Sequence, residues 1–216
     1  MSYPAELRRA GQVLFGENLL TAFGHVSVRD GDRLVITPPT PLGDLDPGAC
    51  RELALDATEL PPGIPLEAWL HLEIYRARPD VGAICRAQPE VATALGSTDQ
   101  PIVPLHGQGA FCGAGVPVFP EAQLVRDRER GERLAAALGH GTALIMCGNG
   151  AVTVGPDIGR ATALMWVLEM SARMNSAAAA AGTRIPLSEA DQAAWRGVAD
   201  ELLGRIWTHL ATQHAD

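Results

Sequence analysis

The chain has 216 residues, of which 47% are hydrophobic and 19% charged, so we expect a folded globular protein with a substantial core. Its formal net charge of -8, without any block of Lys or Arg, argues against nucleic acid and anionic membrane surfaces as partners. We expect a cytoplasmic protein without a secretory signal or membrane span. Its four scattered cysteines lack a C-x-x-C pair, which indicates free thiols rather than a zinc–thiolate site.

A helix and a β-hairpin are predicted near the N-terminus. Apolar residues recur at helical spacing over residues 4–20. Residues 24–29 and 34–37 are short apolar runs around Asp30-Gly31-Asp32, a pattern typical of a β-hairpin. Residues 52–56 are predicted to form a further strand.

A helix that leads directly into a buried strand comes next. The spacing of Leu66, Leu70 and Ile74 predicts a helix over residues 66–78 that buries these three side chains. Residues 81–85 follow at once as an apolar run, which predicts a buried strand. A helix joined so closely to a buried strand indicates a layered α/β sheet.

Arg86 and Gln88 stand at the end of this strand, just before Pro89. Residues two apart on a strand share a face, so both side chains are predicted to project together from its C-terminal end. Open α/β sheets usually hold their ligands at such ends. The strand tip is therefore a candidate site.

The C-terminal half is predicted to continue the alternation of helices and strands. Gly148-Asn149-Gly150, between two apolar runs, is a strong hairpin signal. Residues 1–216 are predicted to form a single domain with a C-terminal helical extension at about 183–216, since no long linker divides them. We expect helices over residues 91–95, 127–138, 157–180 and 188–212 and strands over 101–105, 116–119, 143–147 and 151–154.

Several polar residues are candidates for chemistry, each with a plainer interpretation. Glu67 and His71 are spaced i, i+4 and share a helix face, although on spacing alone a helix-start acid and a structural histidine are the better explanations. His106-Gly107-Gln108-Gly109 is predicted to be a flexible polar loop, suited to a ligand or to an ordinary turn. His25, at the head of the hairpin, is ambiguous. No Gly-rich segment matches a nucleotide-binding pattern.

Taken together, the chain resembles the class II aldolase/adducin family. The resemblance implies a three-layer α/β/α sandwich around a mixed, largely antiparallel sheet, and a homo-oligomer, typically a tetramer. It also implies carbon–carbon lyase chemistry with a divalent metal, held by a His-x-His pair and a third histidine, and with a glutamate as the base. The resemblance is carried by residues 24–29 with 36–38, by Glu67, His71 and Tyr75 ahead of Arg78-Pro79-Asp80, by residues 81–89, and by residues 143–155 with the long helix after them.

The chain departs from the family pattern at the metal positions. Arg86 and Gln88 stand at the His-x-His positions, and Asn149 stands at the third histidine. Glu67 alone matches the catalytic glutamate. Pro65 and Leu66 replace the serines that bind a substrate phosphate, and Phe119 aligns with a tyrosine that donates a proton in some aldolases. An arginine offers a metal no lone pair, and amide oxygens suit hard cations at best.

We therefore expect an enzyme that needs no metal or other cofactor and acts on a small unphosphorylated carboxylic or keto acid. The hypothesis assigns Arg86 to part of the electrostatic role of the metal and Glu67 to the role of general base. It assigns catalysis to Glu67, Arg86 and His71, and substrate binding to His25, Gln88, His106, Gln108 and Asn149.

Two alternatives stay open. Arg86 and Glu67 could form an inert buried ion pair in a non-catalytic binding or interaction domain like the adducin heads. A metal could also be held by relocated ligands such as Glu67, His71 and His106.

Overall fold

The structure, a computed structural model, describes residues 2–214 and alternates helices and strands along the chain. The helices are α1 (Tyr3–Gly16), η1 (Pro47–Ala49), α2 (Ala68–Ala77), α3 (Glu90–Leu95), η2 (Gly107–Cys112), α4 (Arg128–Leu138), α5 (Ile158–Ala181), α6 (Glu189–Gly197) and α7 (Ala199–Gln213), where η denotes a 3-10 helix. The strands are β1 (His25–Asp30), β2 (Arg33–Ile36), β3 (Arg51–Ala54), β4 (Ala83–Ala87), β5 (Val118–Phe119), β6 (Ala143–Met146) and β7 (Gly150–Gly155).

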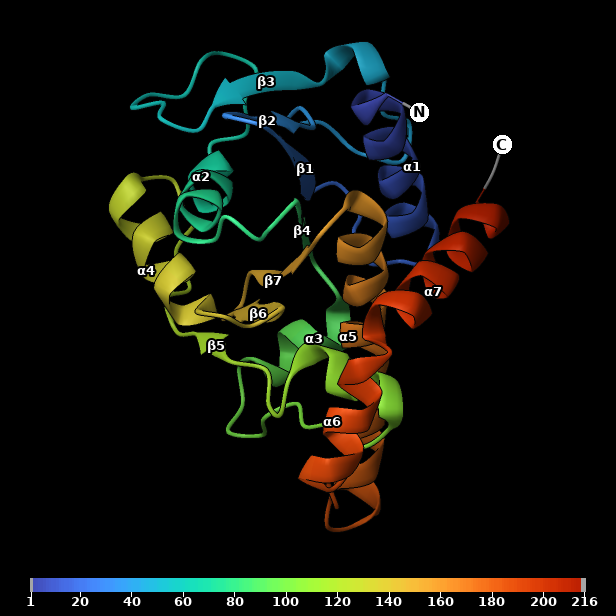
Figure 1. The fold of residues 1–216 in the computed structure, drawn as a ribbon. Helices are drawn as coiled ribbons and strands as arrows, with labels where there is room; N and C mark the ends of the chain where they lie inside the picture. The colour runs from blue at the N-terminus through green and yellow to red at the C-terminus, as the bar shows by residue number, and fades with distance from the viewer. Residues whose placement is uncertain (1, 215–216) are drawn as a thin grey trace.

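The strands form a seven-stranded sheet in the order β3-β2-β1-β4-β7-β6-β5. Neighbouring strands are antiparallel except β5 and β6, which run parallel. Figure 1 shows α2 and α4 on one side of this sheet and α1 and α5 on the other, with α7 beside α5. The predicted three-layer α/β/α sandwich with a largely antiparallel sheet is confirmed.

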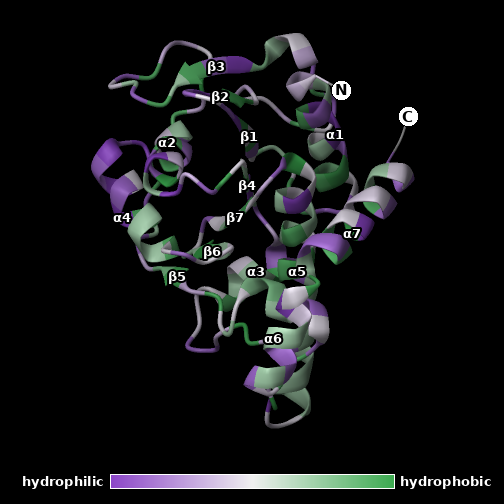
Figure 2. Cartoon of the chain, viewed as in Figure 1, coloured by the Kyte–Doolittle hydropathy of each residue, from purple (hydrophilic) through white to green (hydrophobic). Residues whose placement is uncertain are grey.

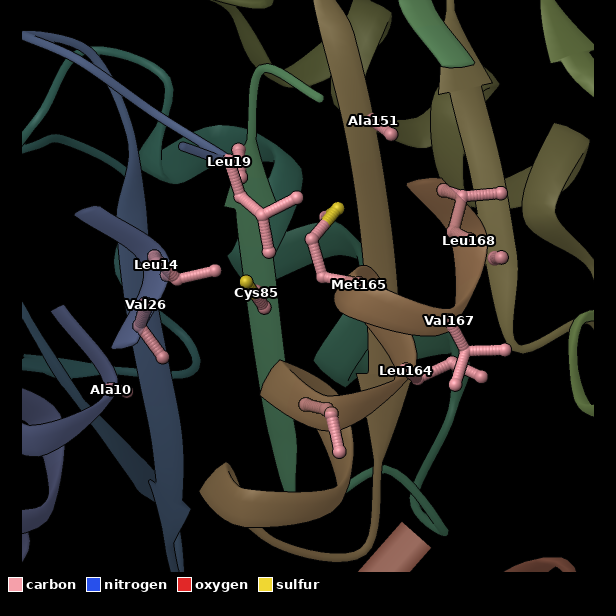
Figure 3. Close-up of a cluster of buried hydrophobic side chains, with 14 of the residues drawn as sticks. Ala10, Leu14, Leu19, Val26, Cys85, Ala151, Leu164, Met165, Val167 and Leu168 are labelled. Atoms are coloured by element: carbon pink, nitrogen blue, oxygen red, sulfur yellow. The ribbon is translucent and has the colours of Figure 1, made fainter. Parts of the chain in front are cut away.

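One hydrophobic core lies between the sheet and α5. Leu14 of α1, Val26 of β1 and Cys85 of β4 meet Met165 and Leu168 of α5 there (Figure 3), and all five are at most 1% exposed. Burying each such side chain contributes roughly 1.5–3 kcal/mol to folding. This face of the sheet is therefore filled by apolar contacts.

A second hydrophobic core lies on the opposite face, under α2 and α4. Ile36, Leu70, Leu134 and Val154 belong to it, and all are nearly or fully buried. Figure 2 shows purple, hydrophilic residues on α4, which covers this core, and green residues on β5 and β6 beneath it. The sheet is thus buried on both faces, as a central layer should be.

Alternation along β1 and β4 decides which side chains face α2. Val26 and Cys85 point into the core under α5, whereas Ile84 points into the core under α2. Because successive strand residues alternate in direction, His25 and Arg86 also point toward α2. These two residues are direct partners in the β1–β4 ladder.

Helix α2 begins later than predicted, and its first expected core residue is not buried. Leu70 and Ile74 are fully buried, but Leu66 precedes the helix and is 57% exposed. The helix itself is buried on nearly all sides, because α4 packs on the face that the sheet leaves open. A prediction from one apolar face therefore underestimates how many residues of α2 are buried.

The strand predicted over residues 101–105 does not form. Pro101 and Pro104 have no N–H to donate to a ladder, which limits pairing. Val103 instead exchanges hydrogen bonds with the side chain of Asn175 on α5, at 3.1 and 2.8 Å. An amide side chain thus replaces a neighbouring strand.

Other elements follow the prediction with local differences. Both predicted hairpins are present, since Asp30 pairs with Arg33 and Met146 with Gly150. The last helix, predicted to be continuous, is divided at Val198 into α6 and α7, directly after Gly197. The four cysteines are free thiols. Within residues 2–214, no helix is both long and apolar enough to cross a bilayer.

Gly82→Ala is expected to lower the free energy of unfolding by about 1–3 kcal/mol, because overpacking a tight contact costs that much. A Cβ at Gly82 would lie 2.0 Å from the carbonyl oxygen of Pro156, which is a backbone atom and cannot turn away as a flexible side chain could. Gly197→Ala is the matched control, since its Cβ meets no atom within 4 Å. Urea unfolding followed by circular dichroism measures both, and equal stabilities would contradict the prediction.

Candidate functional site

A cavity of about 420 Å³ opens beside the β1–β4 ladder. Its wall is mainly apolar and comes from loops, with contributions from Phe23, Pro39, Pro41, Pro65 and Leu66. Phe23 and Leu66 are 68% and 57% exposed, so they stand at the rim. Such a wall suits the apolar or aromatic body of a small molecule.

The polar groups of this cavity are concentrated at one end. His25, Glu67 and Arg86 line it there, and Arg126 lines it from an exposed loop. Arg86 is 2% exposed, so its guanidinium is almost fully removed from water. A buried cation in an otherwise apolar cavity requires a partner.

Arg86, Glu67 and Asn149 are joined in one polar cluster. Arg86 Nη2 donates to Asn149 Oδ1 at 2.7 Å and to the Asn149 backbone oxygen at 3.1 Å, and it lies 3.2 Å from Glu67 Oε2. Asn149 Nδ2 donates to Glu67 Oε1 at 3.2 Å. The cluster joins the strand tip, the start of α2 and the β6–β7 turn, which are far apart in the sequence.

The β6–β7 turn depends on glycine to bring Asn149 to Arg86. Gly148 and Gly150 have φ values of 64° and 92°, in the region that favours glycine. A Cβ at Gly150 would lie 2.2 Å from the carbonyl oxygen of Ala87. Two glycines therefore allow the turn to press against the end of β4.

Two buried nitrogen atoms at the polar end have no hydrogen-bond partner within residues 2–214. They are Arg86 Nε and His25 Nε2. His25 Nε2 lies 3.8 Å from Glu67 Oε2, which is beyond hydrogen-bonding distance. Buried polar atoms are almost always paired, so two unpartnered nitrogens in residues that line one cavity mark this end as a candidate ligand site.

The charges at this end are held in fixed states. Burial raises the pKa of Glu67, but the His25 imidazole and the Arg86 charge outweigh it and lower this pKa to about 2. Burial lowers the pKa of Arg86, which Glu67 partly offsets, and a guanidinium still remains charged. Burial also lowers the pKa of His25. The cavity therefore presents a fixed ion pair beside a neutral imidazole.

His71 does not reach the cavity. It is fully buried behind His25, with its Nε2 2.6 Å from His25 Nδ1 and its Nδ1 2.6 Å from Ser27 Oγ. Burial, together with His25 and Arg86, lowers its pKa well below the ordinary value. The predicted direct catalytic role therefore needs correction, because His71 can act only through His25.

Three predicted substrate-binding residues, Gln88, His106 and Gln108, are not among the residues that line the cavity. Gln88 follows β4, which ends at Ala87. His106 and Gln108 belong to a 3-10 helix segment rather than a flexible loop, and His106 Nε2 lies 3.1 Å from Ser171 Oγ on α5. Of the predicted set, His25 lines the cavity, and Asn149 does not line it but is hydrogen-bonded to Arg86 and Glu67, which do.

Residues 5–176 match the model of the Class II Aldolase and Adducin N-terminal domain. The chain is 27% identical to a 3,4-dihydroxyphthalate decarboxylase of Rhodococcus jostii (strain RHA1) over 214 residues, which cover 89% of this chain and 87% of that protein. It is 30% identical to the enzyme of the same name from Terrabacter sp. (strain DBF63) over 178 residues, 74% of this chain and 73% of that one.

A solved structure supports the same assignment. The L-fuculose-1-phosphate aldolase from Thermus thermophilus superposes with a TM-score of 0.75 at 29% identity, covering 84% of this chain and 97% of that chain. The chain therefore belongs to the class II aldolase/adducin family. It is a class II aldolase-like lyase, as its relatives named as decarboxylases and aldolases support.

The residues at the family's metal position do not fit a divalent ion. Arg86 fills that position with a cation that offers no lone pair. Within residues 2–214, no three His, Cys, Asp or Glu side chains gather as a metal site would require. The relocated ligands Glu67, His71 and His106 are not assembled either, because His71 lies behind His25 and His106 lies against α5.

Two groups of residues near the site were not among the predicted site residues, although Tyr75 and the range that contains Ser27 help to carry the family resemblance. Arg126 lines the cavity from the loop before α4, and no local pattern marks it. Ser27 and Tyr75 join His71 in the buried hydrogen-bonded chain, with Ser27 Oγ 2.9 Å from the Tyr75 hydroxyl. Their spacing could have predicted this, since Ser27 follows His25 by two strand residues and Tyr75 follows His71 by one helical turn, which places each on the same face as its histidine.

Glu67→Gln is expected to remove a pH-dependent part of the stability. The carboxyl titrates with a pKa of about 2 in the folded chain against an ordinary value of 4.5, so its contribution is present above about pH 4.5 and is lost as the pH falls toward 2. At 1.36 kcal/mol per pKa unit, the wild type should lose about 3 kcal/mol more than the variant over this range. Urea unfolding at several pH values measures the difference.

Glu129→Gln, which changes an exposed carboxylate on α4, is the control and should follow the wild-type profile. Parallel profiles for Glu67→Gln and the wild type would contradict the prediction.

Proposed function

We propose that the chain is a metal-independent lyase that cleaves a carbon–carbon bond in a small unphosphorylated carboxylic acid. The observation that carries this proposal is Arg86, a buried guanidinium with an unpartnered Nε at the family's metal position. A guanidinium binds a carboxylate with two hydrogen bonds and stabilises negative charge that develops on oxygen. It supplies part of what a metal ion would supply there.

In the proposed reaction, the electron pair of the broken bond passes into a neighbouring carbonyl and forms an enolate. For a hydroxyl-bearing aromatic acid, the ring first takes up a proton on the carbon that carries the carboxylate and becomes a ring ketone, which supplies this carbonyl. Arg86 stabilises the enolate or phenolate oxygen. In a decarboxylation, carbon dioxide leaves, and a proton from water is then added to the enolate carbon of a keto acid or to the phenolate oxygen of a ring. In an aldol cleavage, Glu67 takes the proton of the substrate hydroxyl and returns it to the carbon after the aldehyde has left.

Substrate binding would change the state of Glu67. In the ligand-free chain, the Arg86 charge and the nearby His25 outweigh burial and keep the pKa of Glu67 at about 2, which is low for a base at neutral pH. A substrate carboxylate that pairs with Arg86 would compete with Glu67 for this cation. The pKa of Glu67 would then rise, since burial without the cation favours the neutral acid.

The cavity wall favours an aromatic or keto acid over a sugar phosphate. Pro65 and Leu66 stand where the family resemblance places phosphate-binding serines, and neither side chain offers a hydrogen bond. Phe23 adds an exposed aromatic face. The relatives named 3,4-dihydroxyphthalate decarboxylases act, by that name, on an unphosphorylated aromatic dicarboxylic acid, which agrees in chemical class.

The proposal extends to the assembly. We propose a homo-oligomer, with the tetramer that the family resemblance implies, and a cytoplasmic location. Ile185 and Phe23 are 82% and 68% exposed in the single chain, which would suit burial in an interface. Light scattering after size-exclusion chromatography measures the mass, and a monomer at micromolar concentration would contradict the oligomer.

Removing metal is expected to leave turnover unchanged. Protein purified without chelator is measured by elemental analysis and then assayed before and after dialysis against a chelator. The assay follows release of carbon dioxide or aldehyde from a panel of hydroxyaromatic and keto acids that includes 3,4-dihydroxyphthalate. Loss of activity with chelator and its return with zinc would overturn metal independence.

Arg86→Gln and Glu67→Gln are each expected to lower kcat/KM by about 100-fold or more, because they remove a charge-stabilising group and a base. Arg133→Gln on α4, an exposed ion-paired arginine, is the control for loss of one positive charge. Circular dichroism verifies that the variants fold. Unchanged turnover in Arg86→Gln contradicts the proposal, and ligand binding without turnover in the wild type would indicate a binding domain.

Arg126→Gln is expected to raise KM for an anionic substrate by about 3- to 30-fold with little change in kcat, because a rim cation mainly attracts and holds the anion. Arg126 forms no ion pair within residues 2–214, so its charge is available to a ligand. Arg128→Gln removes the same charge from α4, where Arg128 pairs with Glu132. The effect of Arg126→Gln should shrink in high salt, and equal KM values for both variants would contradict it.

A further inference from the structure

A chain of hydrogen bonds connects the interior of the α2–β1 contact to the cavity. The Tyr75 hydroxyl lies 2.9 Å from Ser27 Oγ, which lies 2.6 Å from His71 Nδ1, and His71 Nε2 lies 2.6 Å from His25 Nδ1. All four residues are at most 5% exposed. His25 is the member that lines the cavity.

The hydrogen bonds that join Ser27, His71 and His25 can be donated in either of two directions. Burial holds the pKa of both histidines below its ordinary value, so each ring is neutral and carries one N–H. A single hydrogen therefore lies between His25 Nδ1 and His71 Nε2. As a result, the hydrogens from Ser27 to His25 all point toward the cavity or all point away from it.

The carboxylate of Glu67 selects between these directions. Its Oε2 lies 3.8 Å from His25 Nε2. When the hydrogens point toward the cavity, Ser27 donates to His71, His71 donates to His25, and an N–H of His25 faces the carboxylate. In the opposite direction, a nitrogen lone pair would face the same negative charge, which is repulsive at this distance.

We infer that Ser27 and His71 are positioning residues that hold His25 in its Nε2–H tautomer, so that a neutral N–H donor faces the cavity beside Arg86. Within residues 2–214, His25 Nε2 and Arg86 Nε are the buried side-chain nitrogen and oxygen atoms without a hydrogen-bond partner. Both atoms are closed off from solvent in this structure, so a ligand oxygen would reach them only after a local shift of side chains. Such an acceptor, from a carboxylate or an enolate, rests on the proposed function, but the tautomer does not.

The tautomer is measured by nitrogen-15 NMR of the histidine side chains in the ligand-free wild-type protein. We expect the hydrogen of His25 on Nε2. A hydrogen on Nδ1 would overturn the inference, whatever reaction the protein catalyses. The Nε2–H form without any turnover of carboxylic acids would support the inference and count only against the proposed function.

Ser27→Ala tests the positioning role. This variant removes the donor to His71 Nδ1, so that only Glu67 then favours the Nε2–H form of His25, and the population of the Nδ1–H form should rise. Tyr75→Phe is the matched control, since it removes a neighbouring hydroxyl of the same chain but leaves Ser27 to donate. An unchanged His25 tautomer in Ser27→Ala would overturn the role of Ser27.

Activity measurements on two Ser27 variants distinguish a positioning role of Ser27 from a general loss of structure. Ser27→Ala should lower kcat/KM by about tenfold or more, because a histidine in the wrong tautomer cannot donate to the substrate. Ser27→Thr keeps a hydroxyl and should restore both the tautomer and most of the activity. If Ser27→Ala does not fold, the wild-type and Ser27→Thr tautomers remain a decisive measurement, and the Nδ1–H form in both would contradict the inference.

Discussion

The geometry of the site depends on the contact between α2 and β1, which is made largely by polar side chains. Residues that share a face are about 6.6 Å apart on a strand, where they recur every two residues, and about 6.0 Å apart on a helix, where they recur every four. The two spacings are therefore nearly equal. Three strand side chains therefore face three helix side chains in register. The facing pairs are His25 with Glu67, Ser27 with His71, and Arg29 with the ring of Tyr75, 4.8 Å from its guanidinium carbon.

The cluster around Arg86 is not arranged for stability alone. A buried ion pair gains little over an apolar replacement, because removing both charges from water costs about as much as their attraction returns. Glu67 and Asn149 satisfy one end of the guanidinium, yet its Nε has no partner within residues 2–214. An incomplete polar cluster at the base of a cavity is better explained by a ligand that completes it.

Periodicity in the sequence was sufficient for the helices, the buried strand and both hairpins, whereas the meeting of Arg86, Glu67 and Asn149 followed from the family resemblance. Alternation was insufficient for Gln88, which follows the last residue of β4 and is not among the residues that line the cavity. Periodicity was also insufficient for His106, whose helical turn packs against α5 rather than near the strand tip. Spacing indicates which face a residue occupies, whereas its partners depend on contacts between distant segments.

Under the proposed function, a side-chain cation in place of a metal ion would narrow the range of substrates that the site can serve. A guanidinium carries one positive charge where a divalent ion carries two, and it cannot change its coordination during the reaction. A substrate must then spread much of the developing negative charge over its own conjugated atoms. Arg86 is also joined covalently to the strand, so this cation, unlike a bound ion, cannot be exchanged or depleted.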